Sequence, residues 1–142
     1  MPSIGKAALG RPLVRLRALI EASELVAAGL TQSISLGTLP AGAVVEQVMH
    51  EVPVLLADAG SISDVDIEVG TAGTAGYLIT STSVFTGGAQ ARQAGAGTGD
   101  RVALGSTEIL AKFTATGANF GDGSASDLDA GLVAVTVLYR VV

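Results

Sequence analysis

His50 is the first residue to consider for chemistry, because it is the only histidine in a chain of 142 residues that has no cysteine. A Ser-His-Asp triad, a general base near neutral pH or a zinc site would all need this one ring. The chain has no Gly-x-Ser-x-Gly elbow for a nucleophilic serine, and His50 stands beside Glu51 in a predicted strand. We therefore expect no enzyme activity. We expect His50 to be a surface or interface histidine, whose titration would make an interface sensitive to pH.

Three aspartates in one segment are the next group to weigh, since calcium prefers carboxylate oxygens. Asp122, Asp127 and Asp129 do not follow the spacing of an EF-hand, so we interpret them as solvated loop acids, with structural Ca²⁺ as the alternative. The run Gly95-Ala-Gly97-Thr-Gly99 lacks the last glycine of a dinucleotide-binding loop, and no Gly-Lys-Ser/Thr sequence is present. We expect neither a cofactor nor a bound metal.

The charges are divided unevenly along the chain. Half of the eight basic residues lie within the first 17 positions, where no acid occurs, and the 13 acids are all in the body. An acidic body excludes a nucleic-acid groove. The basic start is either an arm that contacts an acidic partner or a frayed terminus that the charges keep soluble; its residues are Lys6, Arg11, Arg15 and Arg17.

Composition indicates a neutral surface of small side chains. The chain is 49% hydrophobic but only 4% aromatic and 15% charged, and a usual soluble domain is about 25% charged. We expect other subunits to cover part of such a surface. Arginines interrupt the N-terminal apolar run, so no signal peptide is expected. No stretch approaches the ~20 apolar residues of a spanning helix, so no membrane partner is expected either.

The elements that would position these residues are mostly strands. Apolar and polar residues alternate with a period of two, and glycine-rich turns follow every 10 to 20 residues or so, which is typical of a sandwich or barrel. Pro53 marks an edge or a bulge in the longest strand. Only 23–29 reads as a helix, of two turns at most. The predicted strands are 13–20, 30–36, 44–56, 64–69, 109–115 and 132–141.

The last strand is apolar on both of its faces. Val133, Val135 and Val137 form one face, so the strand is central in its sheet or buries its other face in an oligomer. The residues predicted for an oligomer interface are Leu132, Ala134, Thr136 and Leu138.

Two long loops, 87–100 and 117–131, are the predicted binding loops, since long loops are often functional. Only Phe120 is well placed to stack on a sugar. The polar candidates in these loops are Arg92, Asp122, Asp127 and Asp129.

One motif suggests a family. Leu36-Gly-Thr-Leu-Pro-Ala-Gly-Ala-Val-Val45 is a strand, a tight turn and a long strand, and Val69-Gly-Thr71, Gly76-Tyr-Leu78 and the valine-rich end follow it. From about residue 20 onward this pattern resembles the small jelly-roll proteins of tailed-bacteriophage virions, of the capsid decoration (cement) or head-fibre type. The "LPAGAVV" turn is its most specific part.

The resemblance implies an all-β protein, an antiparallel β-sandwich of jelly-roll type with one short helix. It also implies an extended N-terminal arm. Residues 13–20 depart from this, because they alternate like a strand, so we expect a basic arm over 1–12 and a single domain over 13–142. Such proteins are made in the host cytoplasm and sit as homotrimers on the outer capsid surface at three-fold positions. They bind the major capsid protein through the arm and the base of the jelly roll, and they have no catalytic residues. The alternative is a receptor- or carbohydrate-binding module of a phage fibre or tail tip.

Overall fold

Strands dominate the computed structural model, which describes residues 12–58, 60–85, 102–103 and 106–141. The regular elements in these residues are β1 (Val14–Glu21), the 3-10 helix η1 (Ala22–Glu24), β2 (Thr31–Leu39), β3 (Ala43–Ala57), β4 (Asp64–Gly70), β5 (Ile79–Ser83), β6 (Val102–Ala103), β7 (Thr107–Thr116) and β8 (Ala130–Val141). No helix in this part of the chain is long and apolar enough to cross a membrane.

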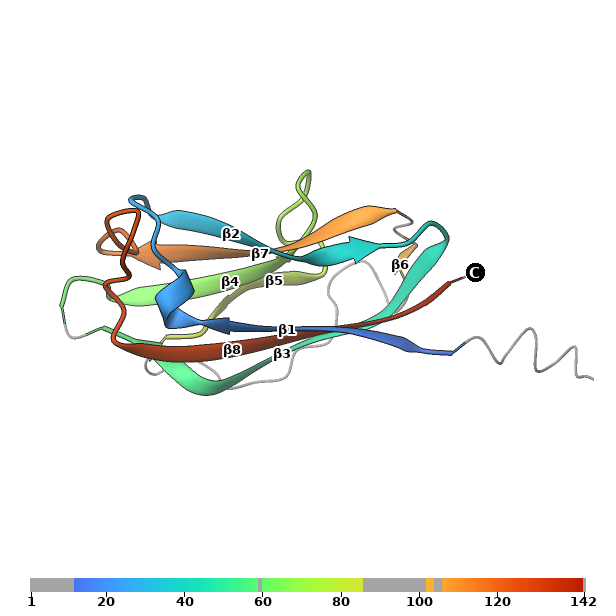
Figure 1. Cartoon of the computed structure of the whole chain (residues 1–142), viewed down its shortest axis with the longest axis horizontal. Helices are drawn as coiled ribbons and strands as arrows, with labels where there is room; N and C mark the ends of the chain where they lie inside the picture. Colours follow the sequence, from blue (N-terminus) through green and yellow to red (C-terminus); the bar gives the residue numbers. More distant parts are fainter. Residues whose placement is uncertain (1–11, 59, 86–101, 104–105, 142) are drawn as a thin grey trace, which may run out of the picture.

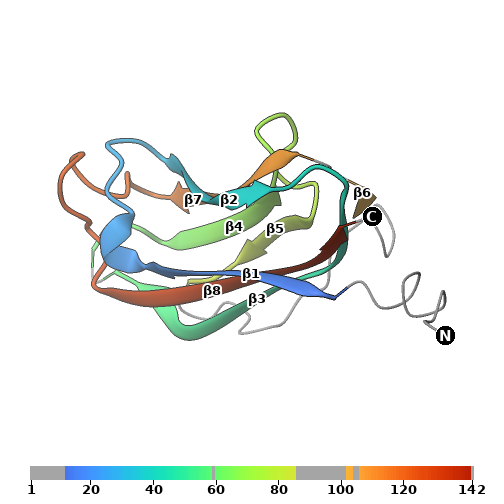
Figure 2. The same cartoon turned by 45° about the vertical axis from the view of Figure 1, so that its right-hand side comes forward.

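The strands form two four-stranded sheets that face each other (Figures 1 and 2). Sheet A has the order β1-β8-β3-β6 and sheet B the order β2-β7-β4-β5, and all named pairings are antiparallel. Four pairings, β1–β8, β2–β7, β3–β6 and β4–β5, describe one long ribbon whose second half runs back along the first. Rolling up this ribbon adds the pairings β8–β3 and β7–β4, and the result is a jelly roll. The predicted fold class is therefore confirmed.

Alternation of apolar and polar residues places one face of each strand in the core. Val65, Ile67 and Val69 on β4 have no exposed surface, while the acids between them point outward. Val133, Val135 and Val137 of β8 face them from sheet A. The terminal strand lies between β1 and β3, which confirms that it is central. The period of two was a reliable signal in strands such as β4 and β7, which bury one face only, whereas β8 buries residues of both faces.

Proline and glycine mark irregularities where the sequence predicted them. The register of β3 on β8 shifts between Glu51 and Val54, so Pro53 occupies a bulge. The turn that follows Leu39 closes with a hydrogen bond from the Ala43 N–H to the Pro40 carbonyl (3.2 Å). This turn carries the chain from sheet B to sheet A, because β2 and β3 lie in different sheets.

The predicted helix over 23–29 is wrong in extent. Only Ala22–Glu24 is helical, and the Glu24 carboxylate accepts a hydrogen bond from the Glu21 N–H (2.7 Å). The Gln32 side chain ends the helix: its Oε1 accepts from the N–H groups of Val26 (2.9 Å) and Ala27 (3.0 Å). A distant amide thus replaces the bonds that a second helical turn would make, which local sequence cannot reveal.

Gly70 permits a close approach of backbone at the end of β4. A Cβ at this position would collide with the carbonyl oxygens of Thr74 and Ala75, whereas a Cβ at Gly73 would meet nothing within 4 Å. The turn is held by mutual backbone hydrogen bonds of Thr71 and Thr74 (3.0 and 3.2 Å), so the Thr74 oxygen is not free to withdraw.

We therefore expect Gly70→Ala to lower the free energy of unfolding by about 1–3 kcal/mol, the usual cost of forcing an extra methyl into a packed site. Gly73→Ala is the matched control in the same turn, and it should change stability by less than about 0.5 kcal/mol. Urea unfolding of both variants makes the comparison. Equal stability of the two would show that the turn can open.

Candidate interaction surface

His50 lies in the core and is neither a surface nor an interface residue. Its side chain has no exposed area, and in the β3–β8 register it pairs with Val135, whose side chain faces the core. Neither ring nitrogen has a hydrogen-bond partner, and burial lowers the pKa of the ring below its ordinary value. The expectation of a surface histidine is wrong, because His50 shares the inward positions of Val48 and Val52. Among the described residues, the ring therefore has no serine or carboxylate partner of the kind that a catalytic triad requires.

The three loop aspartates do not converge. They are exposed, and no group of three or more acids or histidines within the described residues is arranged to hold a metal ion. Asp122 instead organises its own turn: its Oδ1 accepts from the Ser124 N–H and hydroxyl (both 2.9 Å) and from the Ala125 N–H (2.8 Å). These bonds lower the pKa of the Asp122 carboxyl. The geometry favours solvated loop acids over a calcium site.

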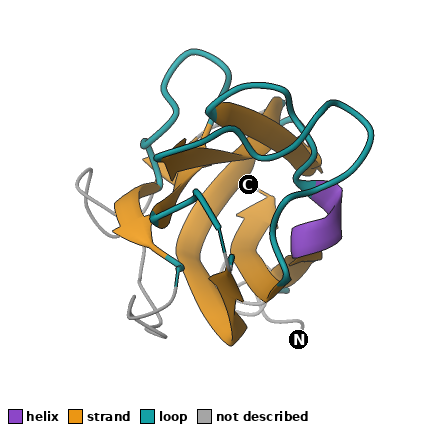
Figure 3. Cartoon of the chain, turned by 90° about the vertical axis from the view of Figure 1, so that its left-hand side faces the viewer, coloured by secondary structure: helices purple, strands orange, loops and turns teal. Residues whose placement is uncertain are grey.

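Phe120 is not available to a ligand. Its side chain is fully buried, and its carbonyl accepts a hydrogen bond from the Asp127 N–H (2.7 Å). Its own N–H donates to the Gly29 carbonyl (3.2 Å), which ties the 117–129 loop to the segment after η1 at one end of the sandwich (Figure 3). The predicted role of Phe120 as a sugar platform is therefore wrong. Arg92 and the 87–100 loop lie outside the described residues.

The outward face of sheet A is the surface with an unusual composition. The even-numbered residues of β8 point away from the core, since Val133, Val135 and Val137 point into it. Their neighbours across the sheet come from β1 and β3 and share this face. We call this surface the A face. Its cross-strand rows are Arg15–Leu138–Gln47, Arg17–Thr136–Met49, Leu19–Ala134–Glu51 and Glu21–Leu132–Val54.

The A face exposes large apolar side chains. Leu19 is 56% exposed and Val54 47% exposed, while Leu132 and Leu138 are half-buried. Two of the four residues predicted for an oligomer interface, Ala134 and Thr136, are already buried within the single chain. Each is a small side chain on the central strand, and its cross-strand neighbours on β1 and β3 are longer. The apolar surface that remains is therefore contributed mainly by the strands that flank β8.

Two of the four basic residues in the first 17 positions lie on this face. Arg15 and Arg17 belong to β1, where their Cα partners on β8 are Leu138 and Thr136. Lys6 and Arg11 lie outside the described residues. Further along β8, the Arg140 Nε is 3.5 Å from the Glu46 carboxylate. The A face thus carries cations at its β1 margin beside an apolar centre.

The outward face of sheet B, which we call the B face, is mostly polar, with Leu110 of β7 as an apolar exception. Asp64, Asp66 and Glu68 of β4 point outward, and serine hydroxyls donate to two of them: Ser83 to Asp64 (2.7 Å) and Ser81 to Asp66 (3.3 Å). Burial and the neighbouring Asp64 charge raise the pKa of Asp66. Serine, threonine and acidic side chains suit contact with water, so the two outer faces of the sandwich differ in chemistry.

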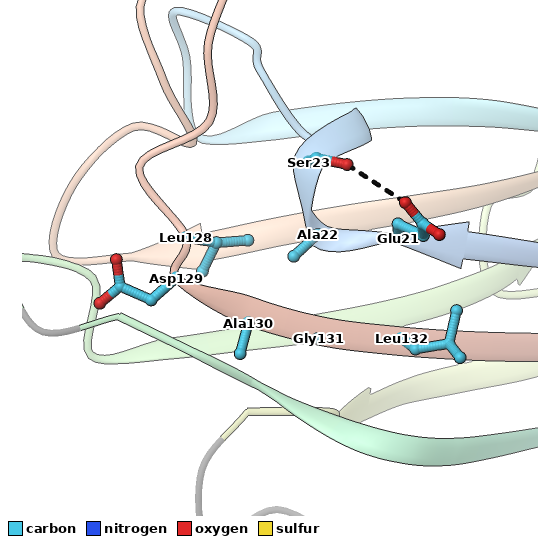
Figure 4. A pocket seen from close by; sticks show the side chains of 8 residues that line it. All are labelled: Glu21, Ala22, Ser23, Leu128, Asp129, Ala130, Gly131 and Leu132. Carbon is cyan, nitrogen blue, oxygen red and sulfur yellow. Dashed lines mark hydrogen bonds between the residues drawn. The ribbon is translucent and has the colours of Figure 1, made fainter.

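Two small hollows occur at the loop end of the sandwich. One of about 260 Å³ lies between η1 and the start of β8, with the carboxylates of Glu21 and Asp129 on its border (Figure 4). The other, about 220 Å³, lies beside Asp58 and Asp127. The Asp58 carboxylate accepts hydrogen bonds from the N–H groups of Gly60 (3.0 Å) and Ile62 (2.9 Å), so its role is to hold the β3–β4 turn.

Two solved structures contain chains that are similar to this one along most of its length. One is described as "Cyanophage Pam1 capsid asymmetric unit": the chains are 20% identical with a TM-score of 0.63, over 92% of this chain and 85% of that chain. The other is "Acidic stable capsid structure of Helicobacter pylori bacteriophage KHP30", at 19% identity and a TM-score of 0.51, over 92% and 94%.

The chain has a fold that is found in phage capsids. No protein-family model matches it, and no curated protein does.

The sequence reasoning missed three residues of the A face: Leu19, Met49 and Val54. Leu19 and Met49 stand at outward positions of their strands, where a polar residue is expected. An apolar residue at such a position could have indicated an exposed apolar surface. Val54 could not be assigned to a face, because the bulge at Pro53 reverses the alternation after it.

The buried position of Phe120 predicts a structural role. Phe120→Ala should lower the free energy of unfolding by about 3–5 kcal/mol, because a large side chain leaves a cavity. Asn119→Ala, at the exposed neighbouring position, is the control and should change it by less than about 0.5 kcal/mol. Denaturant unfolding gives both values. An unchanged free energy of unfolding in Phe120→Ala would contradict the structural role and leave this residue as a candidate for ligand binding.

Proposed function

We propose that this chain is a structural protein of a phage virion, which decorates and stabilises the outside of the capsid as a homotrimer. The observation that carries the proposal is the A face, an outer sheet surface that exposes large apolar side chains, opposite a face that is mostly polar. The major capsid protein and sister copies of this chain are the proposed partners. The protein would act by binding and by covering surface, with no catalytic step.

The exposed apolar residues support a covered A face. Leu19 and Val54 are about half exposed, and half-buried Leu132, Leu138 and Met49 lie on the same face, with charged residues of β1 and β3 between them. Large apolar side chains that are exposed together on one face are typical of a surface that a partner covers, and they support an interface here. The B face has the opposite character, with carboxylates and hydroxyls bonded to one another, and is suited to face solvent. These properties favour an assembly in which sheet A faces inward and sheet B outward.

Similarity of fold to chains of two phage capsids supports the virion role. The low share of charged residues, 15%, agrees with a chain that buries much of its surface on assembly. An aromatic-poor core gives modest stabilisation per residue, and burial between subunits adds to it, since binding that favours the folded state stabilises it. The alternative of a carbohydrate-binding module depended on an exposed Phe120 ring, and this ring is buried.

The basic N-terminal segment supports contact with an acidic capsid surface. Lys6 and Arg11 precede β1, and Arg15 and Arg17 continue the basic character onto the margin of the A face. A cationic segment next to an apolar surface would steer the chain to an acidic partner and then let the apolar contact hold it.

Charged substitutions on the A face should separate the subunits. We expect Leu19→Lys combined with Val54→Lys to raise the dissociation constant of the trimer about a hundredfold or more, because an unpaired charge would be buried between subunits. Analytical ultracentrifugation at micromolar concentration measures the effect. Leu30→Lys is the control, since Leu30 is also exposed (49%) but stands outside the A face, next to β2. A stable monomer in the unsubstituted protein would contradict the trimer.

Removal of residues 1–12 should weaken binding to capsids that lack this protein. All described strands begin after this segment, so the truncated chain should fold and keep its oligomeric state. Loss of Lys6 and Arg11 should raise the dissociation constant from the capsid at least about tenfold at low salt. Co-sedimentation with capsids measures the binding. Equal binding by the truncated and full-length chains would show that the arm is not a docking element.

A further inference from the structure

His50 is a buried ionisable group that the proposed function does not use. Its ring is fully buried on the inner side of β3, between the inward-facing Val48 and Val52. Its cross-strand neighbour is Val135 on β8, and Ala18 on β1 completes the row. Each of these neighbours is apolar.

The ring has unsatisfied hydrogen-bonding groups. A neutral imidazole has one donor and one acceptor, and neither Nδ1 nor Nε2 of His50 finds a partner. Buried polar groups in native proteins are nearly always paired, so an unpaired one calls for an explanation. An apolar side chain of similar size would avoid this cost, which makes the histidine itself noteworthy.

Within the part of the chain that the structure describes, no charge near the ring compensates for protonation. Glu51 and Met49 are its neighbours on β3, but they point to the A face. The inward residues of β1, β2, β4, β5, β7 and β8 include no acid or base among the described residues. The other side chains with an ionisable group that pack against the core there are Tyr77 and Tyr139. An imidazolium at this position would be an unpaired charge in an apolar core.

We propose that His50 makes the jelly roll acid-sensitive, because a proton on its ring cannot be accommodated between the two sheets and therefore favours the unfolded chain. This inference concerns the folding of the chain itself, and it holds whether or not the proposed virion function is correct.

The direction of the pH effect follows from burial. Burial lowers the pKa of His50 from its ordinary value of 6.5, so the unfolded chain takes up a proton at a higher pH than the folded chain. Stability is therefore complete above about pH 6.5 and falls as the pH falls through the window below it. Asp66 has the opposite effect: burial and Asp64 raise its pKa, so the folded chain binds that proton more readily and gains stability in acid. The two contributions can be separated by their sign.

The test is urea unfolding of the full chain from about pH 7.5 to about pH 5, the range in which histidine titrates, at one protein concentration and ionic strength. In the unsubstituted protein, the folding equilibrium constant should fall by up to about tenfold per pH unit below 6.5. His50→Leu and His50→Met should lose this dependence, because neither side chain titrates. Two replacements are used so that failure of one to fold leaves the other. Asp66→Asn is the control and should keep the dependence or steepen it.

A second measurement needs no substitution. The chain has one histidine, so its ring Cε1–H resonance is unambiguous in NMR spectra. That resonance should not titrate at pH 6.5 while the protein remains folded. A normal titration in the folded state, or an unchanged pH dependence in both His50 variants, would overturn the inference.

Discussion

The pairing of β8 with both β1 and β3 is the constraint on which the rest of the structure depends. An isolated ribbon would leave β8 with one neighbour, but the rolled ribbon gives it two. Backbone N–H and C=O groups on both edges of the strand are then satisfied. Val133, Val135 and Val137 meet the inner face of sheet B, which closes the core. The remaining strands follow from this closure, since β2, β7 and β4 must cover the same apolar face from the other side.

The same pairing creates the A face. Once β1 and β3 lie on either side of β8, their outward residues form one surface with Leu132 and Leu138. Ala134 and Thr136 are short, and longer side chains from β1 and β3 lie beside them. Apolar side chains are therefore exposed on this surface next to arginines. The B face has no comparable surface, because the acids of β4 are bonded to hydroxyls on β5. The two outer faces of the sandwich therefore differ in chemistry within the single chain.

Residues that alternate within one strand were predictable, and residues that depend on another segment were not. The strands around Val65 and Val135 and the bulge at Pro53 followed from periodicity and from the missing N–H of proline. The extent of η1 did not follow, since the Gln32 amide that ends it comes from the next strand. Phe120 stands in a run of small polar residues and is buried only because that loop folds back over the end of the sandwich. The inward position of His50 was predictable from its spacing to Val48 and Val52, since residues two apart in a strand share a face.

By itself, the sequence determined the fold class, the longest strands, the two-sided apolar character of the last strand and the basic N-terminal segment. These properties depend on residue type and on spacing along the chain, which a strand converts directly into faces. Only the tertiary structure decided which outward residues share the A face, that Ala134 and Thr136 are covered within the chain, and that His50 and Phe120 belong to the core. Those properties depend on which strands become neighbours and on the register between them, and contacts between distant segments leave no local pattern.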